Sequence, residues 1–350
     1  MRIRVQTFTV HKRSPLTISR GTTAQTTNVW VSVEEDSIEG WGEASPFSIG
    51  TLQQNTGKIV EGLQQVIPSL EAFSPLEHQQ IERVLTGLQI PSASRAALDI
   101  ALHDWVGKRV GLPLWQLWGF DPSRIAPTSV TIGINSPEVA RQRVQDWMQV
   151  ADVQNLKVKL GSPKGIEADQ AMLSAVQAAA PKARLSIDAN GGWNLEQAVT
   201  MCRWLVGHGV QYVEQPLPAG QEEDLKELYN YSPLPIFVDE SCFTSQDIPR
   251  LADRVHGINI KLMKSGGLTE AIRMVHTARA CGLQIMFGCY SDSSLANSAA
   301  AHLSPLADHL DLDSHLNLLD DPFVGASMEA GRLLPNDQPG LGVQHRASNP

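Results

Sequence analysis

The chain has 350 residues, of which 42% are hydrophobic and 19% charged, and its formal net charge at pH 7 is −9. This composition is typical of a globular protein and excludes a disordered or fibrous chain. The negative charge and the lack of a long Lys/Arg run argue against nucleic acid or an anionic membrane as a partner.

Residues 1–122 have the pattern of a small α+β domain, with strands followed by helices. Segments 29–33 and 39–43 are predicted to pair as a hairpin around a turn at residues 35–37. A helix is predicted over residues 94–108, because its apolar positions recur on one face.

Residues 123–320 alternate short apolar strands with amphipathic helices, which is typical of a parallel sheet. The helix predicted at 195–206 has one apolar stripe that would pack on the outside of a barrel. A doubly wound open sheet would show the same alternation, so the choice between an open sheet and a closed barrel depends on the polar residues at the strand ends. We expect a modified TIM barrel, (β/α)7β. Its eight strands are predicted at residues 129–133, 156–160, 185–188, 212–214, 236–239, 257–261, 284–287 and 310–313.

After residue 320 the alternation stops, and residues 321–350 are expected to pack back on the first domain. The four cysteines have neither metal-ligand spacing nor the density of a disulfide scaffold, and the first eight residues lack the apolar core of a signal peptide. We therefore expect reduced thiols and a cytoplasmic location, with a homo-oligomer left open. The cysteines are Cys202, Cys242, Cys281 and Cys289.

Lysines on two predicted strands are expected to point into the barrel. Side chains two apart in a strand point the same way, so Lys157 and Lys159 lie together, opposite an apolar set. By the same rule Lys261 faces them from the sixth strand. Lys264 lies beyond that strand and is expected to serve the turn and the start of the next helix, although a phosphate or carboxylate could also bind there.

Carboxylates end three consecutive predicted strands. Asp188, Glu214 and Asp239 belong to the inward set and are spaced by about one βα unit, so they should converge at one face of the barrel. Three such oxygens suit Mg²⁺, which prefers hard oxygen ligands. Asp311 and Asp313 point inward from the eighth strand and form a second acidic site.

Taken singly, each of these residues would have an ordinary structural role, because a lone Lys or Asp is usually a solvated charge or a helix cap. Together they would place several carboxylates and lysines in one barrel mouth, at a cost on the order of several kcal/mol per unpaired ion. Selection tolerates such a cost mainly for function. The joint pattern therefore predicts an active site.

The combined motifs resemble the enolase superfamily, muconate-lactonizing-enzyme subgroup, and within it the dipeptide epimerases. The resemblance covers nearly the whole chain. It rests on Lys157-Val158-Lys159, Asp188-Ala189-Asn190, Glu214-Gln215-Pro216, Asp239-Glu240-Ser241, Lys261 within residues 259–267, and segments 40–46 and 97–105 of the capping domain. It implies that the three acids bind Mg²⁺ and that the capping domain is a lid.

Three further features bear on the substrate. Asp311-Leu312-Asp313 is similar to the Asp-x-Asp motif with which dipeptide epimerases hold the substrate's α-ammonium, and Asn190 is also expected to contact the substrate. Arg20 lies in a stretch similar to one that places an arginine on an acidic side chain, which favours an Ala-Glu type dipeptide; a solvated loop arginine is an equal alternative. Residues 288–292 depart from the residues expected after the seventh strand.

The resemblance implies a reaction, the epimerisation of a dipeptide's C-terminal residue by 1,1-proton transfer. Mg²⁺ would bind the terminal carboxylate and stabilise the anion formed when the α-proton leaves. Lys159 and Lys261, on opposite faces, would exchange roles as base and acid. Lys157 is expected to make Lys159 a base near neutral pH, because an adjacent ammonium and the dication disfavour its charged form.

Two alternatives remain open. An o-succinylbenzoate synthase, an N-acylamino-acid racemase or a muconate-type cycloisomerase would share the lysines and the metal, but Asp311 and Asp313 would then meet no ammonium. A non-catalytic barrel used for binding would have no reason to bury these charges.

Overall fold

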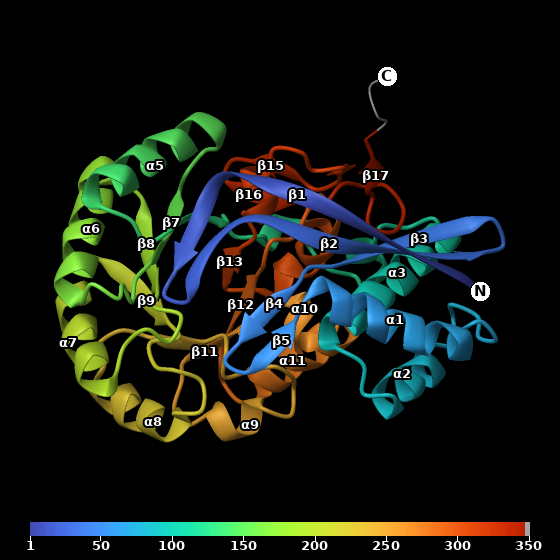
Figure 1. The fold of residues 1–350 in the computed structure, drawn as a ribbon, viewed down its shortest axis with the longest axis horizontal. Helices are drawn as coiled ribbons and strands as arrows, with labels where there is room; N and C mark the ends of the chain where they lie inside the picture. Colours follow the sequence, from blue (N-terminus) through green and yellow to red (C-terminus); the bar gives the residue numbers. More distant parts are fainter. Residues whose placement is uncertain (347–350) are drawn as a thin grey trace.

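Three long strands open the chain in the computed structural model, which describes residues 1–346. Strands β1 (Arg2–Ile18), β2 (Gly21–Glu35) and β3 (Ile38–Ala44) form an antiparallel sheet in that order. The predicted hairpin is confirmed: β2 pairs with β3 across a turn whose residues Asp36 and Ser37 have φ angles of 51° and 62°. The β1–β2 ribbon reaches from the capping domain across the barrel (Figure 1).

The helices of the capping domain pack beside this sheet. They are α1 (Thr56–Leu70), α2 (His78–Gly87), α3 (Ser92–Val110) and the short α4 (Leu114–Leu117), and a small hairpin of β4 (Phe47–Ile49) and β5 (Leu52–Gln54) precedes them. Helix α3 extends two residues beyond the predicted range at each end. It lies so close to β3 that a Cβ atom at Gly40 or Gly42 would collide with backbone atoms of α3. These two glycines set the distance between sheet and helix.

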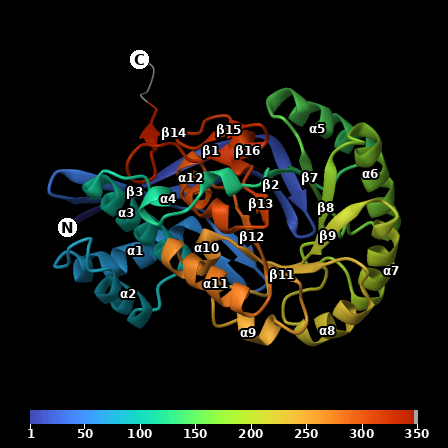
Figure 2. The same ribbon diagram turned by 180° about the vertical axis from the view of Figure 1, so that it is seen from behind.

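Eight parallel strands form the barrel, in consecutive order, and seven strand-to-strand connections carry helices (Figures 1 and 2). The predicted (β/α)7β barrel with its capping domain is confirmed. The strands are β6 (Ser129–Ile132), β7 (Asn155–Lys159), β8 (Arg184–Asp188), β9 (Val210–Glu214), β10 (Ile236–Val238), β11 (Gly257–Ile260), β12 (Gln284–Gly288) and β13 (His309–Asp311). The helices are α5 (Pro137–Val150), α6 (Ile166–Ala179), α7 (Leu195–Val206), α8 (Glu222–Tyr231), α9 (Ile248–Leu251), α10 (Leu262–Ser265), α11 (Leu268–Ala280) and α12 (Ser294–Leu303).

The ring of strands closes between β13 and β6. An isolated parallel bridge joins Thr128 to Leu310, and the Ser129 hydroxyl donates to the Leu310 carbonyl at 3.2 Å. The last strand is shorter than the predicted 310–313, because after Asp311 the backbone turns into a 3-10 helix over Ser314–Asn317. Asp313 therefore lies just beyond the strand, although its side chain stays buried.

The C-terminal segment lies over both parts of the molecule. It contains β14 (Phe323–Val324), β15 (Ser327–Glu329), β16 (Arg332–Leu334) and β17 (Gln344–His345). The Phe323 ring packs edge-on against Phe8 and Trp30 of the capping sheet, at 5.5 and 5.3 Å between centroids. The domain limits given from the sequence stay predictions, and residues 347–350 of the predicted tail lie outside the described residues. Within residues 1–346, no helix combines the length and apolar character needed to cross a lipid bilayer.

Candidate active site

The carboxyl ends of five neighbouring strands bring the predicted lysines and metal-binding acids together. Lys159 on β7, Asp188 on β8 and Glu214 on β9 are register neighbours, because Lys159 pairs with Asp188 and Asp188 with Glu214. Asp239 directly follows β10, and Lys261 directly follows β11. The exposed fraction of each of these residues is 6% or less. The period-2 alternation of the strands thus predicts the inward direction of all five side chains correctly.

Lys157 lies beneath this ring of charges and is fully buried. Its Nζ lies 2.6 Å from Asp311 Oδ2, 2.7 Å from Glu214 Oε2 and 3.3 Å from Asp188 Oδ2. Burial alone would lower the pKa of Lys157, but Asp311, Glu214 and Asp188 outweigh it and raise that pKa well above its usual value. Lys157 is therefore a fixed positive charge two residues before Lys159 on β7.

The two other barrel lysines each pair with one acid. Lys159 Nζ lies 2.5 Å from Asp188 Oδ2, and Lys261 Nζ lies 2.8 Å from Asp239 Oδ2. Despite burial, Lys159 and then Lys157 hold the pKa of Asp188 at about 2, and Lys261 with Lys264 holds the pKa of Asp239 below its usual range.

Lys264 differs from its expected role in the turn. Its side chain is fully buried, with Nζ 2.6 Å from Asp239 Oδ1, and it donates to the carbonyls of Asp239, Cys242 and Asn259, the last two at 2.8 and 3.1 Å. The helix start that follows it is capped by the capping domain instead: Asp99 accepts from the backbone N–H of Thr269 at 3.0 Å. The reason is tertiary, since the sequence pattern cannot reveal an acid docked from another domain.

The three acids fit a divalent cation by their chemistry. Within residues 1–346, no group of three acidic, His or Cys side chains has the geometry of a metal site. Each of these three carboxylates instead contacts a lysine ammonium. Glu214 Oε2 and Asp239 Oδ1 are buried, and each lies against a lysine ammonium, that of Lys157 at 2.7 Å and that of Lys264 at 2.6 Å. The single Lys157 ammonium touches both Asp188 and Glu214, so one cation can reach both. Oxygen donors of this kind suit Mg²⁺.

Glu214 is the one of these three acids whose pKa is raised. Burial and the neighbouring Asp188 raise its pKa to about 7, against the opposing effect of Lys157. The Asn259 amide, which the sequence places inward beside Lys261 without a role, donates to Glu214 Oε1 at 2.8 Å and fixes that carboxylate. Gln215 was missed as well: its side-chain oxygen accepts from the backbone N–H of Asp239 at 2.9 Å. Both residues lie within the quoted motifs, but only their neighbours in space reveal what they do.

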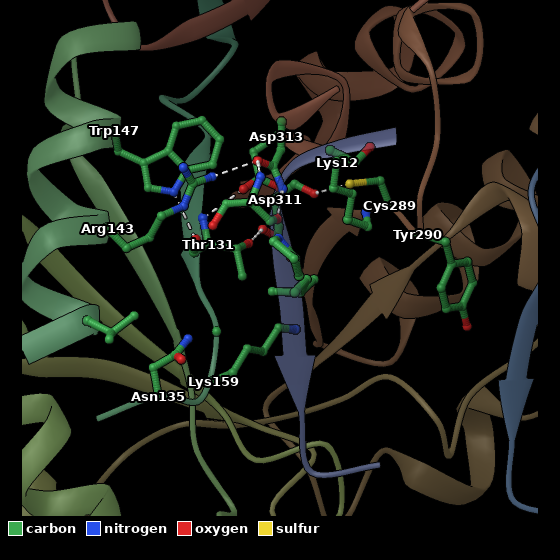
Figure 3. A pocket seen from close by; sticks show the side chains of 17 residues that line it. Lys12, Thr131, Asn135, Arg143, Trp147, Lys159, Cys289, Tyr290, Asp311 and Asp313 are labelled. Atoms are coloured by element: carbon green, nitrogen blue, oxygen red, sulfur yellow. Dashed lines mark hydrogen bonds between the residues drawn. The ribbon is translucent and has the colours of Figure 1, made fainter. Parts of the chain in front are cut away.

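The second acidic site lies in a small cavity of about 70 Å³ (Figure 3). Asp313 accepts from the backbone N–H of Thr131 at 2.7 Å, and burial together with Asp311 raises the pKa of Asp313 to about 6. Asp311 is already bound to Lys157. The two acids therefore differ: Asp311 is balanced within the chain, whereas Asp313 has no ammonium within 4 Å among the described residues. Other labelled side chains around them in Figure 3 are Arg143 and Trp147 of α5, Lys12, Lys159, Cys289 and Tyr290.

Arg20 and Asn190 meet at the edge of the site. Arg20 Nη1 donates to Glu240 Oε1 at 2.6 Å and to the Asn190 carbonyl at 2.9 Å. The Asn190 amide donates to Asp188 Oδ2 and to Glu240 Oε1, both at 3.2 Å, from a backbone with φ of 44°. The Arg20 charge is thus balanced by an acid of the chain itself.

A larger cavity of about 560 Å³ opens between the barrel mouth and the capping domain. Lys159 and Lys261 both line it, as do Arg20 and Asn190. Its capping-domain wall includes Leu16 and Ile18 of β1 and Phe47 of β4; residues 289–291 add Cys289 and Tyr290 from the barrel. The lysines thus border one space, which is large enough for a small molecule.

Two family models match this chain, one over the capping domain and the other over most of the barrel. The N-terminal domain of mandelate racemase / muconate lactonizing enzyme matches residues 2–119, and the enolase C-terminal domain-like family matches residues 139–348. Proteins named hydrophobic dipeptide epimerase from a Flavobacteria bacterium and from Roseobacter litoralis are 46% and 45% identical, each over 98% of both chains. A crystal structure of a dipeptide epimerase from Enterococcus faecalis, with Mg and L-Leu-L-Tyr, has a TM-score of 0.91 and 30% identity, over 98% of this chain and 99% of that one.

Proposed function

The chain belongs to the mandelate racemase / muconate lactonizing enzyme group of the enolase superfamily, and from this premise we propose that it is a dipeptide epimerase. This isomerase would invert the α-carbon of the C-terminal residue of a dipeptide. The observation that carries the proposal is the position of Lys159 and Lys261. Their strands, β7 and β11, stand four places apart in a ring of eight, so the two ammonium groups face each other across one cavity.

The two lysines explain how a stereocentre can be inverted. One Nζ accepts the α-proton from one face of the substrate, and the other Nζ delivers a proton to the opposite face, so one C–H bond breaks and one forms. The roles reverse for the other epimer. Lys157, held charged by its three carboxylates, lies two residues before Lys159 on the same strand.

We assign Asp188, Glu214 and Asp239 as the residues that would hold Mg²⁺. When bound there, the ion would supply positive charge next to the substrate carboxylate, where negative charge grows as the α-proton leaves. Asn190 orients Asp188 through its amide, and Asn259 orients Glu214. The Lys157 ammonium supports this assignment, because it is a cation that already lies within 3.3 Å of both Asp188 and Glu214.

The substrate's α-ammonium is assigned to Asp313. This carboxylate lines the small cavity next to Lys159 and has no ammonium of the chain within 4 Å among the described residues, unlike Asp311. An ammonium there would give a buried acid the ionic partner it lacks. A dipeptide offers such a group, whereas an N-acylated amino acid does not.

For the substrate's side chain we propose a hydrophobic residue rather than the glutamate that Arg20 suggested. Glu240 balances the Arg20 charge, and apolar Leu16, Ile18 and Phe47 line the larger cavity. The two relatives at 46% and 45% identity carry names that point the same way. We also propose a cytoplasmic location, because all four cysteines are free thiols.

The test is proton exchange in D₂O. With Mg²⁺ and a panel of L,L-dipeptides, we expect deuterium at the α-carbon of the C-terminal residue and growth of the L,D epimer, fastest with apolar side chains. Lys159→Ala and Lys261→Ala should each lose epimerisation by about 10²- to 10⁴-fold. Full epimerisation by either variant would refute the two-lysine scheme, and deuterium only in N-succinyl amino acids would favour the racemase alternative.

A further inference from the structure

The ring of Tyr290 lies over one of the two lysines. Lys261 Nζ is 4.5 Å from the centroid of the Tyr290 ring, and both residues line the larger cavity. Tyr290 belongs to segment 288–292, which departs from the pattern expected after the seventh strand. Among the described residues, no aromatic ring lies over Lys159 in the same way. The two lysines therefore have different surroundings.

The position of the ring is fixed from the capping domain. Phe47 stacks on Tyr290 at 4.7 Å between centroids and 8° between planes. The Tyr290 backbone N–H donates to Asp292 Oδ2 at 3.3 Å, and Asp292 in turn accepts from the Ser45 hydroxyl. Ser45 and Phe47 both follow β3 in the chain. A short capping-domain segment thus fixes both the backbone and the ring of Tyr290.

The face of the ring, rather than its hydroxyl, makes the contact with Lys261. Tyr290 Oη is buried and has no hydrogen-bond partner among the described residues. An ammonium over an aromatic face is attracted by the negative charge of the π-system. Lysine has a flexible four-carbon stem, so a contact of this kind restricts where Nζ lies.

We propose that Tyr290 is a positioning residue for Lys261, which it holds toward the reacting carbon, and that it therefore serves only one of the two proton transfers. This inference rests on the proposed function, in which Lys159 and Lys261 work on opposite faces. Asp239, the other contact of Lys261, is assigned there to the metal ion. The Tyr290 ring, unlike Asp239, has no part in the proposed metal site, so it can hold Lys261 when Asp239 binds the ion.

The experiment isolates the two half-reactions. In Lys159→Ala only Lys261 remains to exchange the α-proton, and in Lys261→Ala only Lys159 remains, so each variant should exchange deuterium into one epimer alone. Tyr290→Leu is added to each background, and exchange from L-Ala-L-Leu and L-Ala-D-Leu is followed by proton NMR. We expect Tyr290→Leu to slow exchange by Lys261 about tenfold, which corresponds to about 1.4 kcal/mol. Exchange by Lys159 should stay within about twofold.

Two variants serve as controls. Tyr290→Phe keeps the ring and should leave both half-reactions close to their starting rates, which also excludes a folding defect as the cause of the loss. Phe47→Leu removes the stacked partner that fixes the ring, so it should slow exchange by Lys261 less than Tyr290→Leu does, and it should change KM for both epimers alike because Phe47 lines the cavity. Circular dichroism and thermal midpoints check the fold of each variant.

The outcomes separate this inference from the proposed function. Equal slowing of both half-reactions by Tyr290→Leu, or no slowing of either, would overturn the positioning role while leaving the two-lysine scheme intact. Epimerisation at the full rate by a single-lysine variant would overturn both. Slowing confined to the Lys261 half-reaction, with Tyr290→Phe unaffected, would support the inference.

Discussion

Buried carboxylates occur in two regions of this molecule and are neutralised there in different ways. At the barrel mouth, Asp188, Glu214 and Asp239 lie against lysine ammonium groups. At the contact between the capping domain and the barrel, Glu43 and Asp99 lie against backbone N–H groups at the starts of α12 and α11. The first arrangement places acid beside base, whereas the second satisfies acids with groups that cannot titrate.

The interface shows how a carboxylate can join two domains. Glu43 of β3 accepts from the backbone N–H groups of Ser293 and Ala296, both at 3.0 Å, and from the Asn28 amide at 2.7 Å. The free N–H groups and the dipole at a helix N-terminus offset part of the cost of burying this acid, although burial still raises the pKa of Glu43. Gly267 leaves room for Asp99 at the other helix, because a Cβ there would collide with its carboxylate. Such acids join the capping domain to the barrel.

The difference between the regions supports the proposal that the acids at the barrel mouth take part in chemistry. The interface acids face backbone N–H groups and uncharged side chains, which keep them in one arrangement. In the proposed mechanism, the acids that face ammonium groups would hold a metal ion instead, and the lysines would be free to move protons. The same residue type would then serve structure in one place and reaction in the other.

The largest effect is expected from Lys264→Met, which removes a fully buried cation from Asp239. Loss of one partner of a buried ion pair costs about 3–5 kcal/mol of unfolding free energy, and three carbonyls lose a donor as well. Urea unfolding measures the change. Lys226→Met is the matched control, because its pair with Asp253 is more than half exposed and should contribute less than about 1 kcal/mol. Equal losses of unfolding free energy in the two variants would contradict the expected difference between a buried and an exposed ion pair.

Glu214→Gln should come next, since it removes a proposed metal ligand while preserving the side chain's shape. Wild type in Mg²⁺ at about a hundred times its Kd should gain about 2.7 kcal/mol of unfolding free energy, and the variant should gain almost none. Thermal unfolding with and without Mg²⁺ measures this, and activity is expected to fall in parallel. Glu43→Gln, an equally buried acid at the interface, should keep the Mg²⁺ response. A response retained by Glu214→Gln would reject the metal assignment.

A third prediction concerns the pH dependence of stability at the interface. Burial and the neighbouring Asp292 raise the pKa of Glu43 to about 8, from an ordinary value of 4.5. Between these values the native state binds a proton that the unfolded chain releases, so stability present below pH 4.5 is lost as pH rises through 8. The slope for this group is at most about 1.4 kcal/mol per pH unit. Thermal midpoints from pH 5 to 9 should fall less steeply in Glu43→Gln; an unchanged slope would refute the role of Glu43.

The smallest effect is expected from Asp99→Ala, which removes the acid that caps α11 from another domain. Loss of a cap costs about 1 kcal/mol. Urea unfolding measures the change, and Asn55→Ala, a cap within its own helix α1, offers a comparison of the same kind. If Asp99 also holds the lid in place, its removal should raise KM as well, whereas Asn55→Ala should not. Identical kinetics in both variants would limit Asp99 to a local cap.

The sequence by itself determined the barrel and the inward set of its charges. Side chains alternate between the two faces of a strand because of its covalent geometry. The sequence was therefore enough to assign Lys157, Lys159, Asp188 and Glu214 to the inner face of the barrel. The repeat of strand and helix placed the acids at one end of the barrel, because parallel strands all end on the same side.

Only the tertiary structure decided which groups these charges meet. Lys264 looked like a turn residue, yet it is a buried partner of Asp239, and Arg20 is balanced by Glu240, 220 residues further along the chain. The Tyr290 ring lies between Phe47 of the capping domain and Lys261 of the barrel. Such contacts depend on how two domains dock, and docking is set by shape and charge summed over many distant residues. A local periodic pattern carries the direction of a side chain but not the identity of what it faces.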